Sequence, residues 1–203
     1  MKKTKYNFKI KDGIAEGTLP DGTKFLIDKN MVEIVSQYRF HLNWKGYPYV
    51  MKNKKYKHNI MLHWLILGYD KRPNFLVDHI NRNKTDCRIA NLRIVSNQQN
   101  CMNRGIGKRN NSGYRGVFYN KHRHCYQAKI SINCKQIYLF VSNDKTECAQ
   151  AYNYASELLF KNFAGYKNDV EETSDFIKQI IYEKCAPYLN EAEIATQLCG
   201  DFL

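Results

Sequence analysis

Residues 76–100 read LVDHINRNKTDCRIANLRIVSNQQN, and this stretch decides the fold. It opens with a short apolar strand, residues 75–80, that ends in polar side chains. A polar loop follows, then a second short strand over residues 90–96. Ser96 is a natural N-cap for a helix over residues 97–104, which contain few helix breakers. The stretch therefore predicts the order strand, loop, strand, helix.

Four polar side chains of this stretch are candidates for chemistry. Asp78 and His79 end the first strand, Asn91 enters the second strand, and Asn100 lies within the helix. In such a hairpin the end of the first strand comes close to the first turns of the helix, which would gather these groups around one point. Carboxylate and carboxamide oxygens suit Mg²⁺, and an imidazole beside them could take a proton from water. An Asp-His pair on its own, however, is more often a turn cap beside a surface histidine.

The pattern extends well beyond that pair. Its parts are His63 in LHWLILG, VDHI at 77–80, NKTD at 83–86, NLR at 91–93, Asn100 and Asn103. From His63 to Arg104 the chain resembles the HNH endonucleases, the ββα-metal nucleases, and in particular their phage and intron homing-type branch.

The resemblance implies a role for each polar residue. His79 would be the general base, Asp78 and Asn100 the ligands of Mg²⁺ or Mn²⁺, and Asn91 the residue that holds the loop and thereby the base. The third motif position is Asn100 rather than His, which makes this an H-N-N variant. Zinc or nickel is disfavoured because a borderline-soft ligand is absent. His63 would either contact a DNA phosphate or serve packing.

A second pattern follows GIGKRNNSG at 105–113, a Gly- and Asn-rich basic stretch that predicts a domain boundary. Three strands are predicted after it, and then a helix; the ranges are 114–119, 125–132, 135–140 and 145–163. The segment NSGYRGVFYNKHRHCYQAKISINCKQIYLF and the helix after it resemble the plant ethylene-response-factor (APETALA-type) DNA-binding domain. That domain also occurs fused to HNH homing endonucleases. The match departs at Tyr126, where that family usually has Trp, and at Phe140, where it usually has Gly.

Basic and aromatic residues are interleaved along this predicted sheet. They are Arg115, Arg123, Lys129 and Lys135 with Tyr119, Tyr126 and Tyr138. A sheet of this kind could lie in a major groove, with Arg and Lys on guanine or phosphate and the aromatic rings on sugars. The alternative is an ordinary half-buried sheet with solvated charges.

Composition limits the possible classes of protein. The chain has 203 residues, a net charge of +13 and 43% hydrophobic residues, which excludes a disordered basic tail. No window approaches the apolar length of a membrane span, and the first residues lack the apolar core of a secretory signal. The positive charge lies in residues 1–168, whereas residues 169–203 are acidic. A positive body of this kind attracts polyanions, most often nucleic acid. The seven cysteines form no C-x-x-C pair.

Together these features predict an α+β chain in five parts. The parts are a strand-rich N-terminal segment (1–60), a ββα-metal nuclease core (61–105), a linker (106–112), a three-stranded antiparallel sheet packed on one helix as an ethylene-response-factor-type domain (113–168), and an acidic helical segment (169–203).

The expected function is a homing-type, sequence-specific DNA endonuclease with Mg²⁺ or Mn²⁺ as cofactor. Its partner would be double-stranded DNA, and the protein would be a monomer or weak dimer. It would act inside the cell and would not associate with a membrane. One site per monomer would nick one strand. Two other classes stay open, a DNA-binding regulator that has lost catalysis and an RNA-binding or interaction protein.

Overall fold

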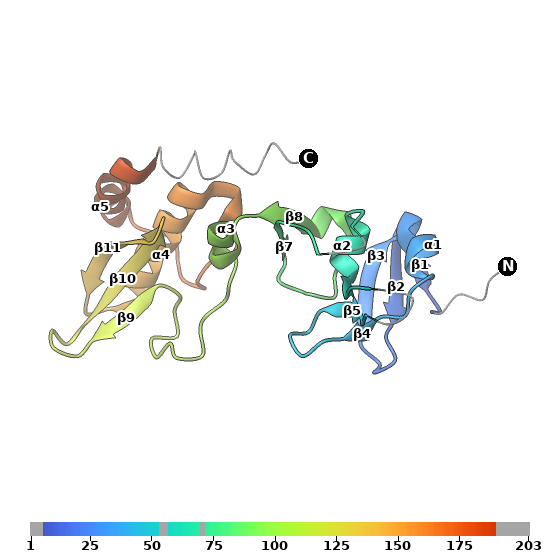
Figure 1. Cartoon of the computed structure of the whole chain (residues 1–203). Helices are drawn as coiled ribbons and strands as arrows, with labels where there is room; N and C mark the ends of the chain where they lie inside the picture. Colours follow the sequence, from blue (N-terminus) through green and yellow to red (C-terminus); the bar gives the residue numbers. More distant parts are fainter. Residues whose placement is uncertain (1–5, 53–56, 70–71, 190–203) are drawn as a thin grey trace. The chain divides into compact units, whose positions relative to one another are not determined.

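The computed structural model describes residues 6–52, 57–69 and 72–189, and it divides into two compact units, Met1–Val95 and Ser96–Leu203 (Figure 1). Each unit has its own hydrophobic core. Several small antiparallel sheets and a few helices make up both units, which confirms the predicted α+β class. Within the described ranges, no helix combines the length and apolar character that crossing a bilayer requires.

The first unit opens with a three-stranded antiparallel sheet in the order β1-β2-β3. Its strands are β1 (Lys9–Lys11), β2 (Ile14–Thr18) and β3 (Lys24–Asp28). Turn-forming residues at 20–22 precede β3, because Pro, Asp and Gly favour the backbone of a tight turn. A short helical stretch then follows, made of η1 (Lys29–Met31) and α1 (Val32–Val35).

A second small sheet follows in the same unit, together with a short helix. Its members are β4 (His41–Leu42), β5 (Pro48–Val50), β6 (Ile60–Met61) and α2 (Leu62–Ile66). β4 and β5 pair antiparallel as a hairpin rich in aromatic residues. Gly68 adopts a φ of +86° just after α2, a left-handed conformation that commonly ends a helix.

The decisive stretch folds as strand, loop, strand, helix, so the predicted order is confirmed. Its elements are β7 (Leu76–His79), η2 (Ile89–Asn91), β8 (Leu92–Val95) and α3 (Asn97–Met102). The two strands pair antiparallel, with Asp78 opposite Arg93 and His79 opposite Leu92. Ser96 caps α3 through a capping box with Gln99, as its residue type predicts.

One core joins the first sixty residues to the nuclease stretch. Phe25 and Phe40 are buried in the same cluster as Leu62, Cys87 and Leu92. The first unit thus contains the N-terminal strands together with β7 and β8 around one hydrophobic core. The five-part division of the chain stays a prediction from the sequence.

The second unit contains a three-stranded antiparallel sheet in the order β11-β10-β9, covered on one face by α4 (Figure 1). The elements are β9 (Val117–Asn120), β10 (Cys125–Ile132), β11 (Lys135–Ser142), α4 (Lys145–Phe160) and η3 (Lys161–Phe163). Three strands and one helix were expected here, and they are confirmed. β11 runs two residues past Phe140, which pairs with Ala128, so the bulky side chain does not end the strand.

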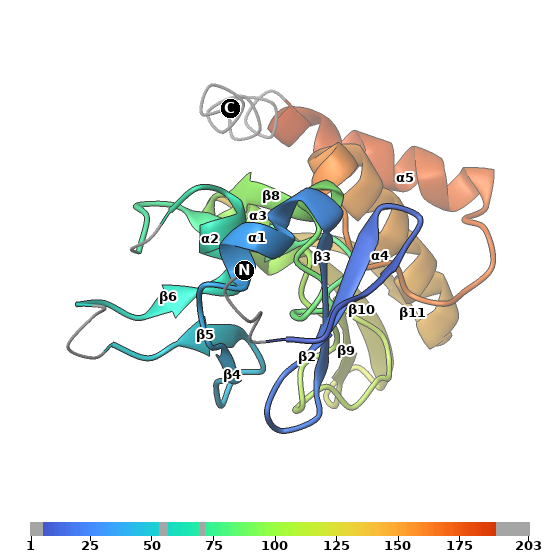
Figure 2. The same ribbon diagram turned by 90° about the vertical axis from the view of Figure 1, so that its right-hand side faces the viewer.

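The acidic segment packs on this unit through α5 (Asp175–Cys185), which lies along α4 and is followed by η4 (Ala186–Tyr188) (Figure 2). Ile177 and Ile181 are buried against it, but Phe176 is 72% exposed. Phe176 lies off the buried face because it is turned about 100° from its neighbour Ile177 around the helix. Residues 190–203 of the segment lie outside the described ranges.

The two compact units divide at Val95, earlier in the chain than the predicted linker at 106–112. Met102 of α3 is buried in the core of the second unit. The carbonyl of Cys101 also accepts a hydrogen bond from the Arg115 side chain. These contacts group α3 with the downstream sheet, although the sequence motif assigns it to the nuclease stretch.

We expect Gly116→Ala to destabilise the second unit severely. Gly116 has a φ of +75°, and an added Cβ would lie 1.9 Å from Cδ2 of Tyr152 on α4. The matched control is Gly113→Ala, where φ is +83° but no atom lies within 4 Å of the added Cβ. The control should lose about 1–3 kcal/mol from backbone strain alone, and Gly116→Ala should lose about 1–3 kcal/mol more. Amide hydrogen exchange of β10 and β11 measures the loss of stability in each variant. Equal losses of stability in Gly116→Ala and Gly113→Ala would contradict the expectation.

Candidate functional site

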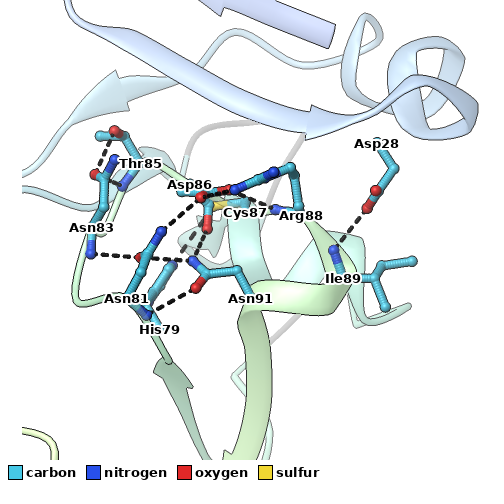
Figure 3. Close-up of polar contacts among 10 residues, drawn as sticks. All are labelled: Asp28, His79, Asn81, Asn83, Thr85, Asp86, Cys87, Arg88, Ile89 and Asn91. Carbon is cyan, nitrogen blue, oxygen red and sulfur yellow. Dashed lines mark hydrogen bonds and ion pairs between the residues drawn. The ribbon is translucent and has the colours of Figure 1, made fainter. Parts of the chain in front are cut away.

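The loop between β7 and β8 is held by a pair of facing amides. Asn91 Oδ1 accepts a hydrogen bond from the Asn81 backbone N–H at 2.9 Å, and Asn91 Nδ2 donates to Asn81 Oδ1 at 2.9 Å (Figure 3). The same Nδ2 donates to the carbonyl of Asp86 at 2.7 Å. Asn91 therefore ties both ends of the loop together, and its own backbone carbonyl accepts from Ile80.

Asp86 is a second fixed point of the loop. Its buried carboxylate accepts from Asn81 Nδ2 at 2.8 Å and from Arg88 Nε and Nη2 at 2.7 and 2.6 Å (Figure 3). Burial acts to raise the pKa of Asp86, but the hydrogen bonds from Arg88 and Asn81 outweigh it and leave the pKa below its ordinary value. The carboxylate is therefore charged at neutral pH.

The loop also docks on the edge of the N-terminal sheet. The backbone N–H of Leu26 in β3 donates to Thr85, and the N–H of Cys87 donates back to Leu26. The Asp28 carboxylate accepts from the N–H of Ile89 at 2.7 Å (Figure 3). The first sixty residues thus supply the edge against which the loop is fixed.

His79 lies at the end of β7 among aromatic rings and is 3% exposed. Its ring centroid is 5.8 Å from that of Tyr47 and 5.2 Å from that of His63. The Cys87 Sγ lies 3.8 Å from His79 Nε2. Burial lowers the pKa of His79 to about 4, although the charge of Asp78 acts to raise it. The imidazole is therefore neutral at neutral pH, as a proton acceptor must be.

Asp78 precedes His79 and is buried with a cation beside it. Arg93, its cross-strand neighbour, brings Nε and Nη2 each to 2.9 Å from Asp78 Oδ2. The described residues contain no group of three or more His, Cys, Asp or Glu placed to hold a metal. A single carboxylate suits Mg²⁺, which keeps several waters and commonly binds through one or two carboxylates and substrate phosphates. The donor at Asp78 therefore fits this ion, which would share the carboxylate with Arg93.

Asn100 lies half-buried on α3 and belongs to the second unit, which is described separately from the first. Its role as a metal ligand stays a prediction from the family resemblance. His63 lies on α2 and is buried against the rings of Tyr47, Trp64 and His79. Burial lowers the pKa of His63 to about 3. This position favours the packing role for His63 over a phosphate contact.

The second unit presents an open sheet face with cations and aromatic rings. Lys129 Nζ lies 4.5 Å from the ring centroid of Tyr138 and 5.6 Å from that of Phe118. The rings of Tyr119 and Tyr126 lie 5.1 Å apart, and Tyr126 is partly buried against the hydrophobic core of this unit. Two further cations predicted to bind DNA are exposed, Arg123 in the turn before β10 and Lys135 at the start of β11.

Arg115 does not share that open face. Its Nε donates to the Tyr152 hydroxyl and its Nη2 to the Cys101 carbonyl, each at 2.6 Å. Its backbone is bracketed by the buried Asn168 side chain, which accepts from Arg115 N and donates to Arg115 O. The guanidinium links α3 to α4 in this conformation, and a DNA contact by Arg115 stays a prediction from the sequence.

Sequence reasoning missed several residues of the first-unit site. Asp86 was quoted in NKTD without a role, and neither Arg88 nor Arg93 was singled out. The alternation of acid and base at 86 and 88 is the local signal that could have indicated an ion pair. Tyr47 carried no signal, because its ring reaches His79 only through the tertiary fold.

A buried Asp-His pair ends β7, a loop closed by Asn91 follows it, and the helix α3 comes later in the chain. A family model described as HNH endonuclease matches residues 67–102. A protein of Acanthamoeba polyphaga mimivirus named as an uncharacterized HNH endonuclease is 31% identical over 145 residues, covering 70% of this chain and 74% of the viral protein. No solved structure matches the chain.

The chain therefore belongs to the HNH endonuclease family. The nuclease part of the predicted resemblance and the assignment to the DNA endonucleases are confirmed. The matched residues include the loop of Figure 3 and run through α3.

We expect Asp86→Asn to lower the free energy of unfolding of the first unit by about 1–3 kcal/mol at pH 7, because charged hydrogen bonds to Arg88 are lost. The folded pKa of Asp86 is lowered, so the contribution of the charge is fully present above the unfolded value of about 4 and disappears as pH falls through the folded value. The difference in free energy of unfolding between Asp86→Asn and the parent should therefore become smaller below about pH 4.

Urea unfolding followed by Trp fluorescence measures this effect, since both tryptophans lie in the first unit. The control is Glu33→Gln, which removes an exposed carboxylate from α1 and should change stability by no more than about 0.5 kcal/mol. A loss in Asp86→Asn that stays constant down to pH 3 would contradict the assignment of the charge.

Proposed function

We propose that this endonuclease is a homing-type, metal-dependent enzyme that hydrolyses phosphodiester bonds in double-stranded DNA with His79 as general base. The observation that carries the proposal is the neutral, buried imidazole of His79 at the end of β7, directly before a loop fixed by Asn91 and Asp86. A fixed position and a neutral ring support this role, since a general base must be held in position and unprotonated.

In the proposed step, His79 takes a proton from a water, which attacks the scissile phosphorus in line. Tyr47 and His63 pack against the ring and limit its rotation. Asn91 acts as a positioning residue, since it fastens the loop that follows the base. The proton ends on the imidazole, where the nearby carboxylates of Asp78 and Asp86 favour the charged form.

Asp78 and Asn100 are the proposed ligands of Mg²⁺ or Mn²⁺, and both offer oxygen atoms. When bound, the ion supplies positive charge that stabilises the phosphate and the leaving oxygen. Arg93 orients Asp78 through the ion pair across the β7–β8 hairpin. An H-N-N set of this type favours Mg²⁺ or Mn²⁺ over Zn²⁺.

The sheet of the second unit is proposed as the module that chooses the DNA site. The matched family model ends at residue 102 and does not reach residues 113–168. The ethylene-response-factor-type assignment of those residues therefore stays a proposal. Its proposed contacts are Arg123, Lys129, Lys135, Tyr126 and Tyr138. Arg115 would act indirectly, by fixing the backbone that leads into β9.

A monomer carries one such nuclease site and would nick one strand, whereas a double-strand cut would need two visits or a weak dimer. We expect the enzyme to act inside a cell, where duplex DNA is its substrate.

His79→Ala should reduce DNA cleavage by about 10²–10⁴-fold, because a positioned general base contributes that much to the rate. The variant removes no positive charge at neutral pH, so its affinity for duplex DNA in Ca²⁺ should stay within about threefold of the parent. Nicking of supercoiled plasmid in Mg²⁺, with an EDTA control, measures the rate.

Near-parental cutting by His79→Ala would show that the base is another residue. A parent protein that binds duplex DNA but never cuts it in Mg²⁺ or Mn²⁺ would instead indicate a DNA-binding regulator.

Lys129→Gln should weaken binding to all duplex sequences and reduce the slope of log affinity against log salt by about 1, as loss of one phosphate contact does. The matched control is Lys178→Gln on α5, since Lys178 lies 3.5 and 3.4 Å from the carboxylates of Glu172 and Asp175. Both variants lose one positive charge from the second unit. Fluorescence anisotropy at several salt concentrations separates them, and equal slopes in the two variants would place the DNA elsewhere.

A further inference from the structure

Trp44 is 90% exposed at the tip of the β4–β5 hairpin. Single exposed apolar residues are common on protein surfaces, so exposure alone has no functional meaning. Trp, however, has the largest ring of any side chain and is mostly buried on average. The setting of Trp44 in the first unit is what gives its exposure a meaning.

The hairpin tip that carries Trp44 has a fixed backbone. Asn43 Oδ1 accepts hydrogen bonds from the N–H groups of Lys45 and Tyr47 at 2.9 and 3.0 Å. The backbones of Asn43 and Tyr47 also pair, and Gly46 supplies the left-handed conformation with a φ of +83°. The backbone that carries the indole is therefore already ordered, so binding costs little backbone entropy.

The same tip is fastened to the nuclease loop. Lys84 Nζ donates to the Lys45 carbonyl at 2.7 Å and lies 4.9 Å from the ring centroid of Tyr47. Tyr47 in turn packs against His79. Trp44 is thus linked through one lysine and one tyrosine to the general base.

The charge around Trp44 suits a polyanion. Lys45 Nζ lies 4.8 Å from the indole centroid, and the exposed Lys84 bonds to the Lys45 carbonyl of the same tip. Within the described ranges of the chain, neither lysine pairs with an acidic side chain. An exposed aromatic ring on a tip that carries two such lysines suits a strand in which bases alternate with phosphates.

We propose that Trp44 stacks against a base step of duplex DNA at the cleavage site, with Lys45 and Lys84 on the flanking phosphates. Apolar side chains inserted between base steps unstack and bend the duplex, and stacking on an aromatic ring tolerates any base. Trp44 would therefore position the scissile phosphate near His79 without reading sequence. The inference rests on the proposed nuclease function and adds a DNA contact to the first unit.

Tryptophan fluorescence tests the contact directly, because the chain has only two tryptophans. Trp64→Phe leaves Trp44 as the single emitter, and Trp44→Phe leaves Trp64. A mixed-sequence duplex is added in Ca²⁺ until anisotropy shows saturation. It should strongly quench the emission of Trp44 in the Trp64→Phe variant, and it should quench the emission of Trp64 in the Trp44→Phe variant far less. Unchanged emission of Trp64→Phe at saturation overturns the proposal.

Binding and cleavage supply a second test that does not need the Trp64 variant. Trp44→Ala should lose about 5- to 150-fold in duplex affinity, the usual effect of removing one stacking ring, whereas Trp44→Phe should stay within about threefold. Far-UV circular dichroism should be unchanged, since Trp44 lies outside the core. Parental affinity and plasmid nicking in Trp44→Ala would overturn the inference and leave the nuclease assignment intact. Quenching without any nicking by the parent would support the contact and refute the proposed reaction.

Discussion

The buried hydrogen bonds of Asn91 and Asp86 are the constraint on which the nuclease site depends. Most side chains of this loop are polar, so its shape depends largely on buried hydrogen bonds that water cannot replace. Asn91 closes the loop at its base, and Asp86 joins Asn81 to Arg88 across it. His79 precedes this loop directly, so its position follows from the same bonds.

The N-terminal sheet extends that constraint into the core. Backbone hydrogen bonds connect Leu26 of β3 with Thr85 and Cys87, and Cys87 is buried in the hydrophobic cluster. Residues 1–60 are thus part of the nuclease unit. They also carry the hairpin whose tyrosine packs on His79 and whose tryptophan faces solvent. The N-terminal segment therefore supports His79 by packing and also presents an exposed tryptophan.

The titratable groups of the nuclease site are buried, whereas cations of the second unit lie at its surface. Burial holds His79 neutral, whereas hydrogen bonds from Arg88 and Asn81 keep the pKa of the buried Asp86 below its ordinary value. On the second unit, Lys129 lies between the rings of Phe118 and Tyr138. The geometry therefore separates groups suited to chemistry from groups suited to binding.

The sequence by itself determined the order strand, loop, strand, helix, the cap at Ser96 and the Asp-His pair, because short-range periodicity and residue type specify local structure. It also predicted the three strands and helix downstream. Only the tertiary structure decided that Arg115 faces α3 and α4, that Phe176 is exposed and that Tyr47 packs on His79. Those features depend on contacts between residues far apart in the chain, and no local pattern encodes which side chains meet across a core.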